Sequence, residues 1–386
     1  MRRLLCIILL LASSDLALSE TIQLKLAVVV PLRSNIADIA NDLVNGAKLA
    51  AIHESKKMQP WPGLTKMDIA IEFFDDSANK DTAKIVANQL VVRGTDAVIG
   101  HFNSGTAMPA SEIYEKADII NISTQGTNPK LTDRGFKYSF RIAADDFRLS
   151  ADLWTYLGKQ KVGRVIAAIN DATAYGMTVT DGLLSQARKD GESISSIKSF
   201  SIENPDDVDW NYLEAKADKD GPNVVFLGGM DLFASKIIDR LPSGKKWVVI
   251  GGDGLASDFF ATHLKSKPHV KAITISQSPN EASVPLDVEF VHRYSSEYSR
   301  KPTNYAAEAY DAVRVLIRAI SLAQSIDSKE VVKQLHSLPA IQGVAGLVEF
   351  DNKGNNIHRI GYVHEIENGK SKLLAILHNG NTSTKN

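Results

Sequence analysis

The sequence predicts an α/β protein with two Rossmann-like lobes, each built on a central parallel sheet with helices on both faces. Short apolar runs alternate with amphipathic helical patterns from residue 22 onward, and the same alternation restarts after Arg141. Strands and helices that alternate in this way form parallel sheets with right-handed crossovers. The chain has 386 residues, more than one domain usually holds, so we expect two separate cores.

The first lobe is expected to open with strands separated by helices. The apolar run Val28-Val29-Val30 is typical of a strand that is buried on both faces of a sheet. Apolar side chains recur at helical spacing over residues 83–90, and Gly94 is suited to end that helix. The expected strands are residues 22–32, 67–74, 96–102 and 119–123.

The second half repeats this alternation and then becomes helical. Residues 287–336 are expected to be a helical region. Two final β segments, 346–350 and 361–367, are joined by Asp351-Asn352-Lys353-Gly354, whose composition is typical of a turn. The expected strands of this half are residues 164–170, 194–202, 223–229, 246–251 and 270–277.

No low-complexity linker divides the chain, so we expect several short crossovers to join the lobes as a hinge. The boundaries that we expect imply three such crossovers. The expected divisions of the chain are residues 1–19 for a signal peptide, 20–143 plus 278–345 for lobe 1, 144–277 plus 346–379 for lobe 2, and 380–386 for a disordered tail.

The amino-terminal segment has the features of a cleavable secretory signal. Arg2 and Arg3 precede an apolar run at residues 4–12, and small residues precede a cut that we place after Ser19. The single cysteine, Cys6, lies within this segment. We therefore expect a mature chain with no thiol, disulfide or lipid anchor, located in the periplasm of a Gram-negative cell.

The charge balance excludes two classes of partner. Lys and Arg number 44 and Asp and Glu number 45, which gives a net charge of -1. Nucleic acids and anionic membrane surfaces select a basic excess, so neither is an expected partner. Beyond the signal, no apolar run approaches the roughly 20 residues of a membrane span.

Polar residues follow several expected strands at the edge where parallel sheets bind ligands. In the first half these positions offer hydroxyls and backbone amides, which suit a carboxylate. In the second half they offer a carboxylate and an aromatic ring, which suit an ammonium and an apolar body. This pairing predicts a zwitterion held between the lobes. The candidate ligand-binding residues are Ser104, Gly105, Thr106, Gln125, Thr127, Tyr175, Met230 and Asp253.

Each of these residues also has a purely structural interpretation. Ser104 can be a helix N-cap, and Asp253 in a glycine-rich stretch can be a turn residue. Tyr175 and Met230 can be packing residues. Only their joint pattern favours a binding site. His101, nearby, is expected to be a buried histidine with its hydrogen bonds satisfied.

Several stretches resemble the type I periplasmic binding proteins of the leucine/isoleucine/valine-binding group, which supply ABC transporters. The resemblance covers roughly residues 22–376 and implies a two-lobed binding protein that works with permease subunits as a monomer, without a cofactor or metal. The matching stretches include Phe74-Asp75-Asp76, Ile99-Gly100-His101, Pro109-Ala110-Ser111, Thr127-Asn128-Pro129, Ala174-Tyr175-Gly176, Gly251-Gly252-Asp253-Gly254 and Tyr305-Ala306-Ala307.

The resemblance implies a role for each site position. The ligand carboxylate would meet Ser104, a backbone amide near Gly105 or Thr106, and Thr127. The ammonium would meet the carbonyl of Gln125, the hydroxyl of Thr127 and the carboxylate of Asp253, and Tyr175 would close over the ligand.

Departures from the leucine-type pattern put the cargo in doubt. The acid at Asp253 is glutamate in those binders, a pocket tyrosine falls at Met230, and Asn103 occupies one position of a disulfide that some relatives carry. Related proteins bind amides, urea or aromatic acids, so a sensor of such a ligand is the alternative function. An enzyme is the less favoured class, because no Gly-x-Gly-x-x-Gly, Walker, His-Glu-x-x-His or Gly-x-Ser-x-Gly motif occurs.

Overall fold

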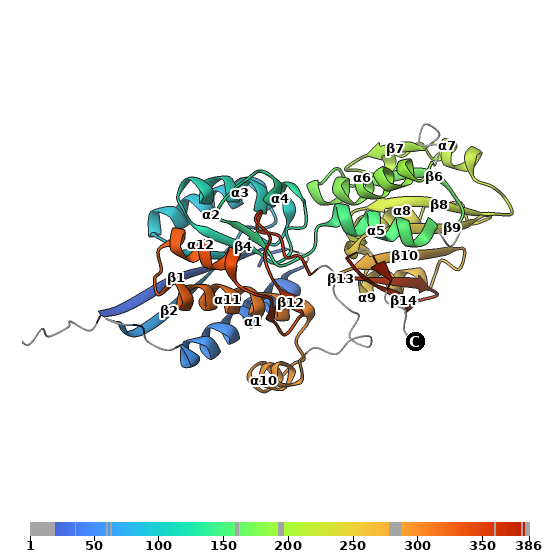
Figure 1. Cartoon of the computed structure of the whole chain (residues 1–386). Helices are drawn as coiled ribbons and strands as arrows, with labels where there is room; N and C mark the ends of the chain where they lie inside the picture. Colours follow the sequence, from blue (N-terminus) through green and yellow to red (C-terminus); the bar gives the residue numbers. More distant parts are fainter. Residues whose placement is uncertain are drawn as a thin grey trace, which may run out of the picture.

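The computed structural model shows two lobes side by side (Figure 1). The predicted signal and most of the expected tail lie outside the residues that it describes. Those residues are 20–34, 36–58, 61, 64–158, 162–191, 197–277, 287–358, 360–379 and 381–382.

Lobe 1 is built on a five-stranded, fully parallel sheet with the order β2-β1-β3-β4-β5. Two apolar clusters cover its faces, one of them formed largely with helices from the carboxyl-terminal half of the chain. The strands are β1 (Glu20–Val30), β2 (Leu64–Asp75), β3 (Ala97–Gly100), β4 (Ile120–Ser123) and β5 (Ser139–Arg141). The helices are α1 (Ala37–Lys57), α2 (Lys80–Arg93), α3 (Ser104–Lys116), α4 (Lys130–Asp133), α10 (Val288–Tyr298), α11 (Asn304–Ala323) and α12 (Ser328–Ser337).

Lobe 2 contains an eight-stranded sheet with the order β15-β14-β13-β10-β9-β8-β6-β7. Strands β6 to β10 run parallel, and β13 to β15 add an antiparallel edge. The strands are β6 (Arg164–Asn170), β7 (Lys198–Ser201), β8 (Pro222–Gly228), β9 (Lys246–Gly251), β10 (Val270–Ser276), β13 (Ile360–Glu367), β14 (Lys370–His378) and β15 (Asn381–Thr382). The helices are α5 (Asp146–Gly158), α6 (Ala174–Lys189), α7 (Trp210–Lys216), α8 (Asp231–Ile238) and α9 (Asp258–Leu264), with short 3₁₀ turns η2 (Pro205–Asp207) and η3 (Asp253–Leu255).

The predicted helical region at 287–336 is three helices. Ser299 and Gln324 adopt left-handed backbone conformations that end α10 and α11. Strands β5 and β14 were not predicted, the first because it has only three residues. Within the tail expected at 380–386, residues 381–382 pair with β14 as β15.

Arg141 lies where the chain first leaves lobe 1, and its buried guanidinium joins several segments. It donates to the carbonyl of Asn128 at 2.9 Å and to the side chain of Asn355, which comes from the last crossover. Val348 and Phe350 belong to the lobe 1 core, so the chain passes to lobe 2 after Phe350 and not at the expected 345–346 boundary. The turn expected at 351–354 is present, with the Asp351 carboxylate accepting the N–H of residue 353 at 2.8 Å.

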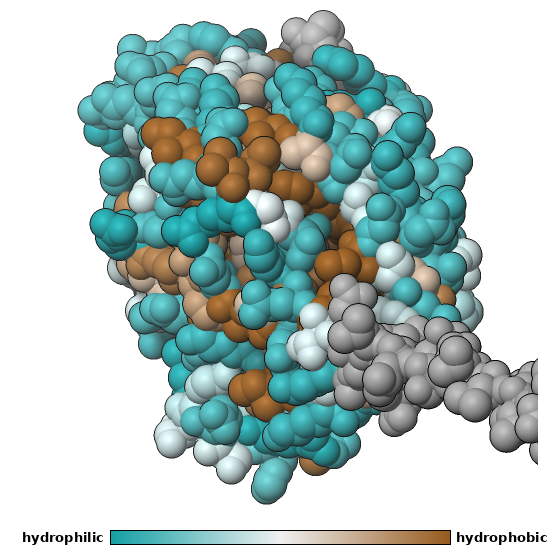
Figure 2. All heavy atoms as spheres, turned by 90° about the vertical axis from the view of Figure 1, so that its left-hand side faces the viewer, coloured by the Kyte–Doolittle hydropathy of each residue, from teal (hydrophilic) through white to brown (hydrophobic). Residues whose placement is uncertain are grey.

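Hydrophilic side chains cover most of the end of lobe 1 that points away from lobe 2, with hydrophobic ones showing between them in groups (Figure 2). Among the described residues, no helix is both long and apolar enough to cross a membrane.

Helices α1 and α11 of lobe 1 pack closely against each other where Gly46 meets Ala306. A Cβ added to Gly46 would lie 2.0 Å from the carbonyl oxygen of Ala306, which is backbone and cannot move aside without shifting α11. We expect Gly46→Ala to lower the free energy of unfolding by about 1–3 kcal/mol, measured by urea denaturation. Gly105→Ala is the control for this measurement, because a Cβ there meets no atom within 4 Å.

Candidate functional site

Two loops of lobe 1 carry the predicted carboxylate-binding residues, and a hydrogen bond joins them. Ser104 is the first residue of α3, and its hydroxyl accepts the backbone N–H of Asn128 at 3.1 Å. The N–H of Thr106 donates to the Asn103 carbonyl at 3.1 Å, so it is already engaged. Gly105 is exposed, and the first N–H groups of a helix lack intrahelical acceptors. Of the two backbone amides predicted here, that of Gly105 is the better placed.

A buried network behind these loops holds them together. His101 contacts Asp76 through Nδ1 at 2.6 Å and the hydroxyl of Tyr114 through Nε2 at 3.0 Å. The Ser123 hydroxyl donates to the His101 carbonyl at 3.0 Å and accepts the N–H of Gly126 at 2.8 Å. His101 is therefore the buried, satisfied histidine that the sequence predicted.

Lobe 2 supplies an acid and a tyrosine that contact each other. Tyr175, in the first turn of α6, donates its hydroxyl to the Asp253 carboxylate at 2.7 Å. The same hydroxyl accepts the N–H of Gly254 at 2.7 Å. Burial and the charge of Asp253 raise the pKa of Tyr175 well above its usual value, so the phenol stays protonated. Burial also raises the pKa of Asp253.

A second carboxylate, that of Asp146, was not predicted from the sequence and lies near both Thr127 and Asp253. Asp146 opens α5 and is 2% exposed. Its carboxylate is hydrogen-bonded to the side chain of Thr127, while its Oδ2 has no partner among the described residues. Burial first, and then the charge of Asp253, raise the pKa of Asp146 well above its usual value. Asp146 therefore interacts both with Thr127 of lobe 1 and with Asp253 of lobe 2.

Asp146 could have been suspected from the sequence only weakly. It is one of two adjacent acids after Arg141, where the alternation of strands and helices restarts. Acids in the first turn of a helix are common because they interact with its dipole, so that position carried no signal of a ligand site.

Gln125 connects the site to the hinge. The side-chain N–H of Gln125 donates to the carboxylate of Glu308 on α11. The side-chain carbonyl of Gln125 accepts from the side-chain amide of Gln277 at 3.0 Å. The side chain of Gln277 in turn accepts the N–H of Ala144 in the first crossover at 2.7 Å. Met230 precedes α8, is half-buried, and donates its backbone N–H to the carboxylate of Asp171.

Asn128 forms a direct contact between the lobes. Its side-chain amide donates to the hydroxyl of Thr178 at 2.7 Å and to the carbonyl of Ala174 at 3.1 Å, both on α6. These acceptors adjoin Tyr175. The loop that carries Thr127 and Asn128 therefore lies against the first turns of α6, which carry Tyr175.

Removal of the Asn128 side chain should weaken ligand binding by reducing the stability of the closed arrangement. We expect Asn128→Ala to raise the dissociation constant about tenfold, since one or two hydrogen bonds of about 1 kcal/mol each are lost. Isothermal titration calorimetry measures this change. Asn88→Ala, on the exposed face of α2, is the control. An unchanged affinity would show that this contact does not stabilise the bound form.

A cavity of about 390 Å³ opens between the lobes beside these residues. Its lining includes Gln125 and Tyr305 from lobe 1 and Asp253 and Thr274 from lobe 2. It lies at the carboxyl ends of β9 and β10, where parallel sheets bind ligands.

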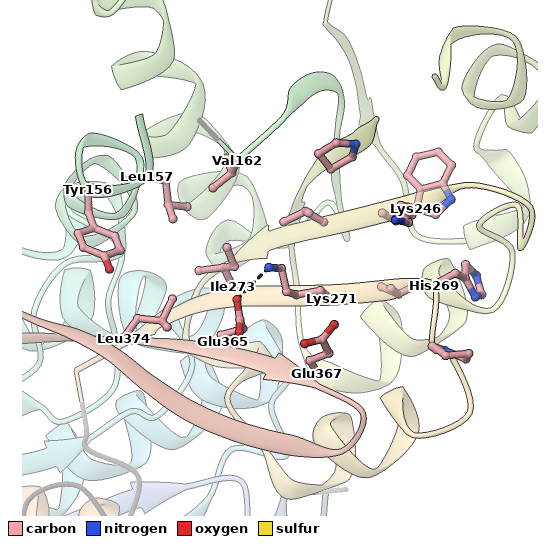
Figure 3. A pocket seen from close by; sticks show the side chains of 15 residues that line it. Tyr156, Leu157, Val162, Lys246, His269, Lys271, Ile273, Glu365, Glu367 and Leu374 are labelled. Carbon is pink, nitrogen blue, oxygen red and sulfur yellow. Dashed lines mark ion pairs between the residues drawn. The ribbon is translucent and has the colours of Figure 1, made fainter. Parts of the chain in front are cut away.

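A larger cavity, of about 620 Å³, lies at the opposite end of lobe 2 (Figure 3). It is lined by the amino-terminal ends of β9 and β10, and two of its charged side chains, Lys271 and Glu365, pair with each other at 2.9 Å. Two of the predicted site residues, Gln125 and Asp253, line the smaller cavity and none lines the larger one, so we place the candidate ligand site at the smaller cavity. Among the described residues, no cluster of His, Cys, Asp and Glu could hold a metal ion.

Comparison with known proteins identifies the family of the chain. A family model described as periplasmic binding protein matches residues 23–371. The Leu/Ile/Val-binding protein homolog 1 of Brucella suis is 29% identical over 327 residues, which cover 84% of this chain and 85% of that protein.

Solved structures share the fold. A leucine binding protein from Thermotoga maritima has a TM-score of 0.77 at 18% identity, covering 92% of this chain and 99% of that chain. A branched-chain amino acid transporter substrate binding protein from Streptococcus pneumoniae, in complex with isoleucine, has a TM-score of 0.73 at 22% identity, covering 92% and 99%. Since the family model spans nearly the whole chain and these structures have the same fold, the chain belongs to the periplasmic binding protein family.

Proposed function

We propose that this protein captures an amino acid in the periplasm and presents it to the permease subunits of an ABC transporter. The observation that carries the proposal is the opposition of two chemistries across one cleft. The amino terminus of α3 with Ser104 supplies donors for a carboxylate, and Asp253 with Asp146 supplies acceptors for an ammonium. Leucine, isoleucine and valine are the first ligands to test, because related proteins are named for them.

Binding would proceed in two steps. The carboxylate docks on lobe 1 at Ser104, the N–H of Gly105 and Thr127, and lobe 2 then brings Asp253 and Tyr175 over the ammonium. The closed form is stabilised because the second set of contacts exists only there. The permease would recognise the surface of that closed form.

A thermal-shift screen of the mature chain from Glu20 tests the proposal. An amino acid at about 1,000 times its dissociation constant should add about 4.1 kcal/mol to the free energy of unfolding. Each ligand is compared with its α-amide and its decarboxylated amine, which lack the carboxylate. A shift with the amino acid alone supports the proposal. No shift with any amino acid, or an equal shift with the amine, would refute it.

Affinity for a zwitterion should rise with pH. The pKa values of Asp146 and Asp253 are raised in the ligand-free protein, so protons stay bound above the ordinary carboxyl range. A bound ammonium favours the carboxylate forms and lowers these pKa values, so binding releases protons. The dissociation constant should therefore fall as pH rises from about 4 through the raised pKa values, and then level off. Calorimetry in buffers of different ionisation enthalpy measures the protons released, and uptake of protons would contradict the expectation.

A further inference from the structure

The cleft cavity extends away from Asp253 over the sheet of lobe 2, and two buried side chains there have unused polar atoms. Thr274 on β10 and His364 on β13 are directly opposite each other in the antiparallel register, and both line the cavity. They are 0% and 3% exposed. Within the described part of the chain, Oγ1 of Thr274 and Nε2 of His364 have no hydrogen-bond partner.

The protonation state of His364 makes its unused nitrogen an acceptor. The ring interacts with the backbone carbonyl of Tyr362, and Nε2 is the nitrogen without a partner, so Nδ1 carries the donated proton. Burial lowers the pKa of His364, which keeps the ring neutral near pH 7. A neutral imidazole with a proton on Nδ1 presents a lone pair at Nε2.

The charged groups around this part of the cavity are acidic. Asp253 and Asp258 belong to its lining, and Glu308 lies behind Gln125. Neither lysine nor arginine occurs among the lining residues that the structure describes. The described lining of this part of the cavity therefore offers hydrogen-bond acceptors and no cationic donor. A ligand group that carries N–H donors would complement these acceptors.

We propose that this part of the cavity is the side-chain subsite of the ligand, and that it selects amino acids whose side chains carry N–H donors over aliphatic ones. Suitable groups are a carboxamide, an ammonium or a guanidinium. The proposal rests on the amino-acid-binding function proposed above and departs from the cargo for which the relatives are named.

The expected selectivity follows from the cost of leaving a buried polar group without a hydrogen bond, which is larger than the gain from forming one. An aliphatic side chain in the cavity would leave Oγ1 of Thr274 and Nε2 of His364 without a hydrogen-bond partner in the bound state, which penalises binding. A donor-bearing side chain would satisfy both atoms. Sites built in this way discriminate more strongly against a ligand that lacks the polar group than apolar pockets discriminate by size.

The experiment compares ligands of the wild-type protein by isothermal titration calorimetry. L-asparagine and L-leucine form a shape-matched pair, L-glutamine and L-arginine extend the reach of the donors, and L-isoleucine and L-valine complete the aliphatic set. We expect at least one donor-bearing amino acid to bind tenfold or more tightly than every aliphatic one. Aliphatic binding that is equal or tighter overturns the subsite proposal and leaves the amino-acid function standing. Binding of no amino acid overturns both.

Two variants locate the selectivity. Thr274→Val removes the hydroxyl at nearly constant shape, and His364→Leu removes the acceptor nitrogen. Each should reduce the preference for the donor-bearing ligand at least fivefold while leucine affinity stays constant or improves. Ile273→Val is the control, because Ile273 points from the same strand into the core on the opposite face. A preference that survives both variants overturns the assignment to this subsite, and the wild-type comparison stands even if one variant does not fold.

Discussion

Asp253→Asn is expected to raise the dissociation constant of the amino-acid ligand about 100-fold or more. The carboxylate stands in the cleft, hydrogen-bonded to Tyr175, and is the predicted partner of the ligand ammonium. Asparagine keeps the shape but loses the charge. An enclosed ammonium then loses a charge-assisted hydrogen bond, worth about 1.5–3 kcal/mol, and carries part of the cost of an unpaired buried charge, about 3–5 kcal/mol. Each 1.4 kcal/mol is about tenfold in affinity.

Calorimetry with the best ligand of the screen measures this effect. Asp207→Asn is the matched control, because Asp207 is an exposed carboxylate of the same lobe on η2. The variant should also release fewer protons on binding, since one of the two neighbouring acids with a raised pKa is gone. A dissociation constant within a few-fold of the wild-type value would refute the assignment of Asp253 as the ammonium partner.

Arg141→Met is expected to lower the free energy of unfolding by about 3–5 kcal/mol. The guanidinium is buried, and its hydrogen bonds to Asn128 and Asn355 join a site loop to the last crossover. It also lies 4.0 Å from the carboxylate of Asp145. Methionine fills much of the same space without a charge. Asp145 is then left with the more exposed Arg148, at 3.3 Å, as its counter-charge, and the carbonyl of residue 128 loses its donor.

Urea denaturation measures the loss, and Arg164→Met, at an exposed position on β6, is the control. Ligand affinity should fall as well, because the loop that carries Thr127 and Asn128 is no longer tied to the hinge. A free energy of unfolding within about 1 kcal/mol of the wild type would show that the remaining contacts hold the hinge without Arg141.

The sequence by itself determined the order of strands and helices and the positions of the site loops. Periodicity records whether a side chain faces a core, so β6 and β9 were predicted to the residue. In a parallel sheet, the carboxyl ends of strands meet at one edge, so Ser104, Thr127 and Asp253 could be proposed as site residues before any contact was known.

The tertiary structure alone decided which distant segments meet. Asp146 looks like an ordinary helix-opening acid until packing places it beside Thr127 and Asp253. Thr274 and His364 are 90 positions apart, and only the pairing of β10 with β13 brings them into one cavity. The third crossover follows Phe350 because that side chain packs in the lobe 1 core. Local patterns encode burial, whereas the identity of the neighbour depends on how two sheets and their helices pack together.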